Sequence, residues 1–460
     1  MVGRDAGTSL AVVAGTTAAA YSLAGGRWGA YLAVGPVFVT DILVALACLA
    51  LLLRVGLRGR WIARTGGLAI PVLALLAWTA VRLVLGGRAD LIALRDAAPY
   101  LYAVMGLVGG VALANSTARQ RERTATVVSA ALAFHTAWVF LVTILMPSVV
   151  ARMPTLSEAQ DIRVFTLRPD FDIAITGAFV AYWLSRLLHT GVSWRAALAL
   201  GAGIPVIMLG GGSRAGMLGA LTPCVLFAVW QLRRVTLPDR ARSAIVGIAF
   251  LALIPLAWVG ATTGTGQRLL AGIGIDQGSA RAANAVGTLR AREQAWQRVT
   301  TYAFERPERL AAGVGFGPDY MEQSGALYRL VGPRPAEDVR PRSPHSWWLG
   351  TLVRLGLVGF LCVAFLVART LFRALASSAP WSRAAGDFPR LYVLSVGIFF
   401  ALLLPASLGV VLESPFGAVP FFWCVGIILA WGGLTTQPRA ENTRSAAETG
   451  ARGWPGWATR

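Results

Sequence analysis

The sequence contains no lysine, so its 42 basic residues are all arginine; they outnumber 22 acidic residues and give a net charge of +20. The absence of lysine excludes Schiff-base chemistry and catalysis by a lysine base. Charged residues as a whole are scarce, at 14% against the roughly 25% of soluble domains, while 56% of the residues are hydrophobic. A chain of 460 residues with this composition indicates a polytopic membrane protein rather than a soluble fold around one core.

Cysteine and histidine are also scarce, which narrows the metal and redox chemistry. Four cysteines lie inside apolar runs without Cys-x-x-Cys spacing, and we expect them to be buried small hydrophobic side chains: Cys48, Cys224, Cys362 and Cys424. The sequence therefore predicts no disulfide framework and no zinc-type site, and we expect neither a metal nor a cofactor. Among three histidines, we expect His135 to pack beside Trp138 and His189 to lie at the surface.

Apolar runs long enough to cross a bilayer predict about 12 transmembrane helices. They cover residues 9–24, 36–53, 67–85, 98–115, 124–146, 172–188, 196–211, 214–231, 244–262, 346–368, 391–411 and 416–434. We interpret the first run as an uncleaved span rather than a signal peptide. The predicted fold class is an all-α polytopic membrane protein.

The placement of arginine predicts the orientation of these helices, because basic residues near span ends are retained in the cytoplasm. With a cytoplasmic N-terminus, 22 arginines fall in inner segments and 7 in short outer loops. We therefore expect both termini in the cytoplasm. Most of the positive charge reports orientation, so it does not indicate a nucleic-acid partner.

One outer connection, residues 263–345, is long enough to form a domain. The predicted organisation is nine helices in 1–262, this extracytoplasmic loop domain, three helices in 346–434 and a disordered cytoplasmic tail at 435–460. The loop holds 11 arginines against 8 acidic residues. Long loops do not follow the charge rule, so these arginines need another explanation.

Three glycines followed by Ser213 and Arg214 stand at the outer mouth between the seventh and eighth spans, in MLGGGSRAGMLGA. Ser213 is a good N-cap for the eighth span. An arginine at the positive end of a helix dipole is unfavourable unless an anion lies there, in which case amides and guanidinium converge on it. The alternative is that Arg214 extends to lipid phosphates.

The segment LRAREQAWQRVTTYAFERPER (289–309) predicts an amphipathic helix in the loop, with Trp296 and Val299 at helical spacing and Pro307 at its end. Arg292 lies four residues before Trp296, hence on the same face, and we expect it to be aimed at the membrane boundary. The alternative is a solvated helix with intrahelical Arg–Glu pairs. The following GVGFGP lacks the strand–turn–helix context of a nucleotide loop and predicts a turn.

The third feature, RPRSPHSWWLGTLVRLGLVGF, enters the tenth span from outside. We expect Ser343 as N-cap and Pro344 at the first helical position, which puts His345 in the first turn. There the helix dipole disfavours imidazolium, so His345 should be neutral near pH 7, as a general base must be. We expect the tryptophans at 347–348 in the interfacial aromatic belt. The alternative is a structural interfacial histidine.

Polar residues inside spans cost free energy unless they are paired or hydrated. Asp41, Arg82 and Arg354 are of this kind. We expect Asp41 to pair with a span arginine, with a proton relay as the functional alternative. Asp170 and Asp172, at the outer edge of the sixth span, are the best spare carboxylates for binding an acceptor.

The order of these features resembles the O-antigen ligase and polymerase family. SRAG opens a span, one long outer loop carries an Arg-x-x-x-Trp helix, a proline and GVGFG, and PHSWWLGTLVRLGLVG enters the next span. The resemblance covers residues 200–360 by motif and the rest by topology. It implies a GT-C-like fold with one long helical extracytoplasmic loop.

The resemblance implies transfer of a glycan from an undecaprenyl-pyrophosphate carrier to an acceptor hydroxyl, on the outer face of the cytoplasmic membrane. The implied partners are the lipid-linked glycan, a saccharide or glycolipid acceptor, and membrane lipid. The resemblance places the pyrophosphate-binding arginines at Arg214 and Arg292 and the essential histidine at His345. The candidate supporting residues are Ser213, Arg290, Asp170 and Asp172.

Elementary chemistry agrees with these positions. A pyrophosphate leaving group needs charge neutralisation, which planar guanidiniums supply in place of a divalent ion. We expect His345 to orient or deprotonate the acceptor hydroxyl for attack at the anomeric carbon with inversion. Arg290 competes with Arg292 for the anion-binding role, but only Arg292 has the four-residue spacing to Trp296.

Other functions stay open at this point. A peptidoglycan-type polymerase has similar topology but is expected to depend on an outer-loop aspartate. A transporter or flippase of lipid-linked sugars predicts charged residues along a central cavity and inverted repeats, neither of which we find in the sequence. The sequence does not distinguish ligase from polymerase, and it does not name the glycan or the acceptor.

Overall fold

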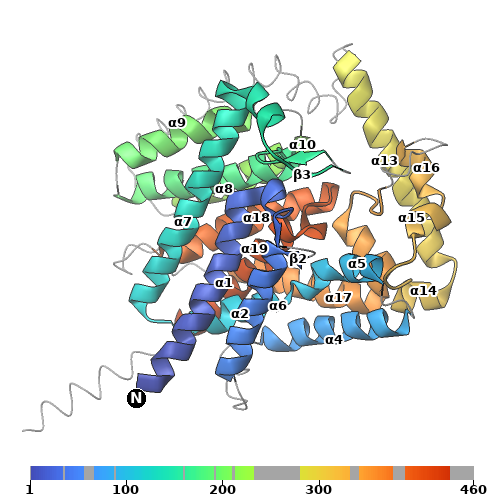
Figure 1. Ribbon diagram of the computed structural model, residues 1–460, viewed down its shortest axis with the longest axis horizontal. Helices are drawn as coiled ribbons and strands as arrows, with labels where there is room; N and C mark the ends of the chain where they lie inside the picture. The colour runs from blue at the N-terminus through green and yellow to red at the C-terminus, as the bar shows by residue number, and fades with distance from the viewer. Residues whose placement is uncertain are drawn as a thin grey trace, which may run out of the picture.

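The computed structural model describes residues 2–34, 37–55, 67–86, 90–114, 116–158, 161–190, 193–209, 213–232, 280–331, 341–376 and 389–435. These residues are mostly helical (Figure 1). The strands that they contain form two short antiparallel pairs: β1 (Ala33–Val34) with β2 (Val37–Phe38), and β3 (Thr155–Ser157) with β4 (Ile162–Arg163). The all-α prediction is confirmed over this part of the chain.

The N-terminal half is a succession of apolar helices. They are α1 (Val2–Gly29), α2 (Val39–Val55), α4 (Ala69–Leu85), α5 (Leu91–Leu101), α6 (Val104–Ala114), α7 (Ala118–Phe140) with its π-helical extension Leu141–Leu145, the 3-10 helix Pro147–Arg152, α8 (Pro169–Thr190), α9 (Trp194–Leu209) and α10 (Arg214–Leu232). In Figure 1, α7, α1 and α2 run steeply, whereas α8, α9 and α10 lie across their upper ends.

Eleven of the predicted spans coincide with helices in the structure, and the ninth, 244–262, lies outside the described residues. The fourth is divided between α5 and α6. By length and composition, four helical segments among the described residues can cross a membrane: Leu91–Val111, Ala118–Leu145, Trp347–Ala376 and Arg390–Leu408. The apolar helices therefore support a membrane protein, while the total of 12 spans stays a prediction. The predicted tail, 435–460, lies outside the described residues after Thr435.

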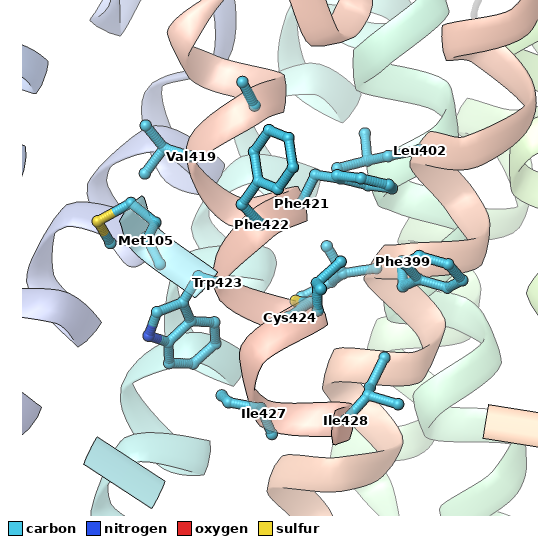
Figure 2. Close-up of a cluster of buried hydrophobic side chains, with 14 of the residues drawn as sticks. Met105, Phe399, Leu402, Val419, Phe421, Phe422, Trp423, Cys424, Ile427 and Ile428 are labelled. Atoms are coloured by element: carbon cyan, nitrogen blue, oxygen red, sulfur yellow. The ribbon is translucent and has the colours of Figure 1, made fainter. Parts of the chain in front are cut away.

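The C-terminal helices α18 (Arg390–Leu408) and α19 (Pro415–Thr435) form the centre of the main core. Figure 2 shows the side chains of α19 extending to both sides, with Phe421 toward Phe399 of α18 and Trp423 on the opposite side. The Phe399 and Phe421 rings stack with centroids 5.2 Å apart. Cys424 is fully buried here, as predicted, whereas the other three cysteines are half-buried, and all four are free thiols.

The long loop forms a separate layer at the right edge of Figure 1. Its helices are α13 (Ala280–Phe304), α14 (Pro307–Ala312), α15 (Tyr320–Gln323) and α16 (Ala326–Val331). A small core holds them together, and it includes Val299, Tyr302, Met321 and Leu327. The amphipathic helix is thus confirmed, but it begins before the predicted Leu289 and Pro307 starts the next helix.

The helix α17 (Trp347–Ala376) is interrupted at Gly356, whose φ of 64° is left-handed. The interruption removes helical partners from nearby carbonyl groups, which must then be satisfied elsewhere. The amides of Val314 and Gly315 donate to the carbonyls of Val353 and Arg354, at 2.8 and 3.0 Å. The GVGFGP segment is therefore a turn, as predicted, and it docks into a break that the prediction of a continuous span did not include.

Replacing Gly356 with alanine is expected to destabilise the protein by about 2 kcal/mol or more. A Cβ there would lie 2.4 Å from the Ala311 carbonyl oxygen and the Gly313 nitrogen, in addition to the strain of a positive φ. Thermal unfolding of the detergent-purified protein measures the effect. Gly201→Ala is the matched control, because a Cβ at this exposed helical position meets no atom within 4 Å. Equal melting temperatures for the two variants would contradict this account of the break.

Candidate active site

The first part of the site is the N-terminus of α10. Ser213 is the N-cap, as predicted, because its hydroxyl accepts a hydrogen bond from the amide of Gly216 at 3.1 Å. Arg214 is then the first residue of the helix. A Cβ on Gly216 would lie 2.4 Å from the Pro169 carbonyl oxygen, so the absence of a side chain lets α10 meet the start of α8. The preceding glycines, 210–212, lie outside the described residues.

The start of α8 adds an arginine that no sequence motif indicates. Arg168 pairs with Asp170 through two hydrogen bonds, from Nε at 2.8 Å and from Nη2 at 3.2 Å. Asp170 is therefore engaged by Arg168 rather than spare. The amide of Arg168 donates to the carboxylate of Asp172, which is fully buried. The signal that could have identified Arg168 is its position two residues before an acidic residue at a helix start.

The third part comes from α13 in the long loop. Arg292 donates from Nη1 to the Leu408 carbonyl oxygen at 3.0 Å, at the end of α18. Trp296 donates from its indole nitrogen to the Pro344 carbonyl oxygen at 2.6 Å. The predicted shared face of these two side chains is thus confirmed, and it points toward the membrane helices. Arg290 is exposed, because two residues along a helix turn its side chain to the opposite side.

His345 completes the arrangement, but not in the predicted local structure. The helix α17 begins at Trp347, so Ser343 and Pro344 are not its N-cap and first residue, and His345 precedes the first turn. His345 instead has a left-handed backbone, with φ of 56°. Its amide donates to the Ser343 hydroxyl at 3.2 Å, which makes a local turn that competes with the helix start.

The charges around His345 show which groups lie together. Burial, followed by the positive charges of Arg292 and Arg168, lowers the pKa of His345 to about 4, against an opposing effect of Asp170. Burial and the neighbouring Arg214 lower the pKa of Arg292, with Asp170 again opposing. His345 is therefore neutral at pH 7, as predicted, but the cause is desolvation and arginine rather than a helix dipole.

A buried ionic cluster lies behind this site. Asp96 of α5 pairs with Arg354 of α17 at 2.6 Å and with Arg342 at 2.8 Å, and its carboxylate also accepts from the Gly317 amide. The Arg354 guanidinium lies 5.1 Å from the centroid of the Tyr320 ring. Because these groups come from α5, α15, α17 and two loop segments, the cluster fixes the loop to the membrane helices.

Other predicted polar residues have partners that bear on the fold rather than on the site. Asp41 accepts a hydrogen bond from the Tyr102 hydroxyl at 2.6 Å, and no arginine among the described residues forms the expected ion pair with it. Arg82 donates to the Gly313 carbonyl oxygen at 2.8 Å. His135 is fully buried with its ring 5.0 Å from that of Trp138, as predicted.

Two expectations about position have different outcomes. Trp347 is fully buried in the main core, so the prediction that it lies in an interfacial belt was wrong. Trp348 is partly exposed. The core position follows from the helix start at Trp347, which turns its ring toward Phe421 and Phe422. The side chain of His189 lies outside the described residues.

The geometry combines a cluster of positive charge with a neutral imidazole. Arg168, Arg214 and Arg292 come from three separate segments, and the charges of Arg168 and Arg214 both act on Arg292. Three arginines and the opposing carboxylate of Asp170 leave a net charge of about +2 around Arg292, which in turn acts on the imidazole of His345. This arrangement suits a doubly charged phosphate ester next to a group that can accept a proton.

Comparison with known protein families finds a match over the middle of the chain. A family model described as O-antigen ligase matches residues 196–364. The matched segment includes Arg214, Arg292 and His345, and it confirms the resemblance to the O-antigen ligase and polymerase family. No curated protein matches the chain.

Asp96→Asn is expected to lower the stability by roughly 3 kcal/mol, because it leaves Arg354 buried without its counter-charge. Both side chains are less than a tenth exposed. Thermal unfolding in detergent checks the loss. The control is Asp161→Asn, which removes a carboxylate that is 84% exposed and pairs with Arg163 at the surface, and it should change the melting temperature little. A melting temperature of Asp96→Asn equal to that of the control would refute the structural role of the cluster.

Proposed function

From the O-antigen ligase domain at residues 196–364, we propose that the protein transfers a glycan from an undecaprenyl- or other polyprenyl-pyrophosphate carrier to an acceptor hydroxyl. The reaction takes place on the outer face of the cytoplasmic membrane, and both termini lie in the cytoplasm. The acceptor is a saccharide or a glycolipid. The family supports a ligase or polymerase type of activity, and the donor and the residue roles are our proposal.

The observation that carries this proposal is a group of arginines beside a neutral histidine: Arg292 and Arg168 act on His345, and Arg214 acts on Arg292. The polyprenyl-pyrophosphate donor carries one negative charge on each phosphate, and the pyrophosphate gains one more when its bond to the anomeric carbon breaks. Arg214 and Arg292 stabilise that charge, because planar guanidiniums match phosphate oxygens in pairs. These guanidiniums supply the neutralising positive charge in place of a divalent ion, so the proposed transfer is metal-independent.

The proposed chemical step is a single displacement. The acceptor oxygen forms a bond to the anomeric carbon while the bond between that carbon and the phosphate oxygen breaks, which inverts the configuration. His345 accepts the proton of the acceptor hydroxyl, and the electron pair of the broken bond stays on the pyrophosphate. The low pKa of His345, about 4, keeps the imidazole in its proton-accepting form at neutral pH.

Three further residues, Ser213, Asp170 and Asp172, hold the charged groups of the site in position. Ser213 caps α10 and so fixes the start of the helix that carries Arg214. Asp170 holds Arg168 through two hydrogen bonds and keeps its guanidinium near Arg292. Asp172 binds the backbone of the same residue. We assign no role to Arg290, which is exposed.

His345→Ala is expected to lower the transfer rate by at least about 100-fold, because it removes the proton acceptor. The assay is glycan transfer by the purified protein from a polyprenyl-pyrophosphate oligosaccharide. The amount of protein in the membrane and its elution in detergent should not change. A His345→Ala protein with wild-type activity would exclude the proposed mechanism.

Arg214→Lys and Arg292→Lys separate an enzyme from a transporter. Lysine keeps the charge but loses the paired hydrogen bonds, so each variant should lose most of the transfer activity, about tenfold or more. Arg298→Lys is the matched control, on an exposed position of the same helix α13. Full activity in both site variants would favour a path that only requires positive charge, as in a transporter of lipid-linked sugars.

One incubation distinguishes the two activities within the family. The purified protein is supplied with the lipid-linked oligosaccharide, with and without a candidate acceptor. Chain elongation without an added acceptor identifies a polymerase, and transfer that requires the acceptor identifies a ligase. Release of no polyprenyl pyrophosphate in either case would contradict glycan transfer.

A further inference from the structure

His345 has a backbone conformation that is unfavourable for a residue with a side chain. Its φ of 56° is left-handed, which costs roughly 1–2 kcal/mol relative to the right-handed region. Such a conformation persists only where the surroundings determine it. The contacts that hold residues 342–345 are therefore part of what directs the imidazole toward the arginines.

Side chains from other elements bind this short segment at successive residues. Arg354 donates to the Arg342 carbonyl oxygen at 3.3 Å, and Trp296 donates to the Pro344 carbonyl oxygen at 2.6 Å. The bond that reaches His345 itself comes from Ser343, whose hydroxyl accepts the His345 amide at 3.2 Å. The position of that hydroxyl consequently affects the backbone of His345 directly.

The Ser343 hydroxyl is oriented by a second group. It donates to the Oε1 atom of Glu413 at 2.5 Å, a residue 70 positions away in the sequence. A serine hydroxyl has one proton, so donation to Glu413 leaves a lone pair for the His345 amide. Glu413, Ser343 and His345 thus form a chain of hydrogen bonds that ends at the backbone of the histidine.

Glu413 belongs to the connection between α18 and α19, at the end of the 3-10 helix Val411–Glu413. The same connection begins after Leu408, whose carbonyl accepts the hydrogen bond from Arg292. One short segment therefore contacts the anion-binding arginine at one end and the histidine segment at the other. This places Glu413 where it can align the two halves of the site.

We propose that Glu413 is a positioning residue: through Ser343, its carboxylate fixes the backbone of His345 and thereby sets the rate of the chemical step. This inference rests on the proposed function. Glu413 acts through the hydrogen-bonded chain, because the charges that act on the imidazole are those of Arg292, Arg168 and Asp170.

The electrostatic environment makes this contact sensitive to pH. Burial raises the pKa of Glu413 to about 7, and the hydrogen bond from Ser343 opposes the shift. The charged and titratable groups that face it are Arg354, Asp96, Arg168, Tyr100 and Tyr320. Asp96 is held in its charged form by the ion pairs with Arg342 and Arg354. Free arginine and tyrosine side chains change charge only at alkaline pH, so within this set Glu413 is the group that changes charge near neutrality.

The sign of the pH effect follows from the raised pKa. Above pH 7 the carboxylate is charged and accepts a charge-assisted hydrogen bond from Ser343. As the pH falls through 7, Glu413 is protonated and the bond becomes a weaker neutral one. The kcat should therefore fall toward low pH with a midpoint near 7, while His345, with a pKa of about 4, stays neutral over the same range.

The test is the pH profile of kcat between pH 6 and 8 for Glu413→Gln, which keeps an acceptor oxygen but cannot titrate. We expect the limb near pH 7 to disappear, with kcat at pH 8 reduced about tenfold and the KM for the lipid-linked donor unchanged. Glu308→Gln, at an exposed position in α14, is the matched control and should keep the wild-type profile. A profile without a limb in the wild type, or an unchanged limb in Glu413→Gln, would overturn the proposal.

A double-mutant cycle tests whether the two residues act in one chain. Ser343→Ala is expected to lower kcat by about 10- to 100-fold, and adding Glu413→Gln should cause little further loss, because coupled residues are not additive. If the double variant instead loses kcat by the product of the two single losses, Glu413 does not act through Ser343 and the proposal is overturned. If His345→Ala is inactive and these variants behave as wild type, only this inference fails; if His345→Ala is active, the proposed function fails as well.

Discussion

The docking of the 313–315 turn into the broken helix α17 is the interaction on which the site depends. Two amides of the turn replace the partners that the carbonyls of Val353 and Arg354 lose at Gly356. The turn follows α13 and α14 directly, so its attachment determines where α13 can lie. Arg292 is carried by α13, and His345 immediately precedes α17. The break in α17 is thus the attachment point that determines where both Arg292 and His345 lie.

The buried ion pairs strengthen this attachment and make it specific. Asp96 binds Arg342 and Arg354 at once, and the chain between those arginines contains His345. Removing charges from water is expensive, so a cluster of this kind contributes more to the choice of one arrangement than to net stability. The connection between α18 and α19 meets the same segment from the other side, through Leu408 and Glu413.

Local patterns predicted much of the molecule. Apolar runs indicated most of the helices, and Ser213 and the spacing of Arg292 were interpreted correctly, because each depends on neighbouring residues alone. The break at Gly356 was missed, since a glycine in an apolar run is typical of a continuous span. Arg168 stands in no recognised motif, and the role of Glu413 depends on contacts between distant segments. The predicted start of α17 was wrong because the Ser343 hydroxyl accepts the His345 amide in a local turn instead of capping the helix.

The central claim is that the arginines bind pyrophosphate while His345 acts in a later step, and binding of a polyprenyl pyrophosphate to purified protein tests it most directly. We predict that His345→Ala binds this lipid as tightly as the wild type, and that Arg292→Ala binds it at least about tenfold more weakly, a loss of about 1.4 kcal/mol. An Arg292→Ala protein with wild-type affinity would contradict the account.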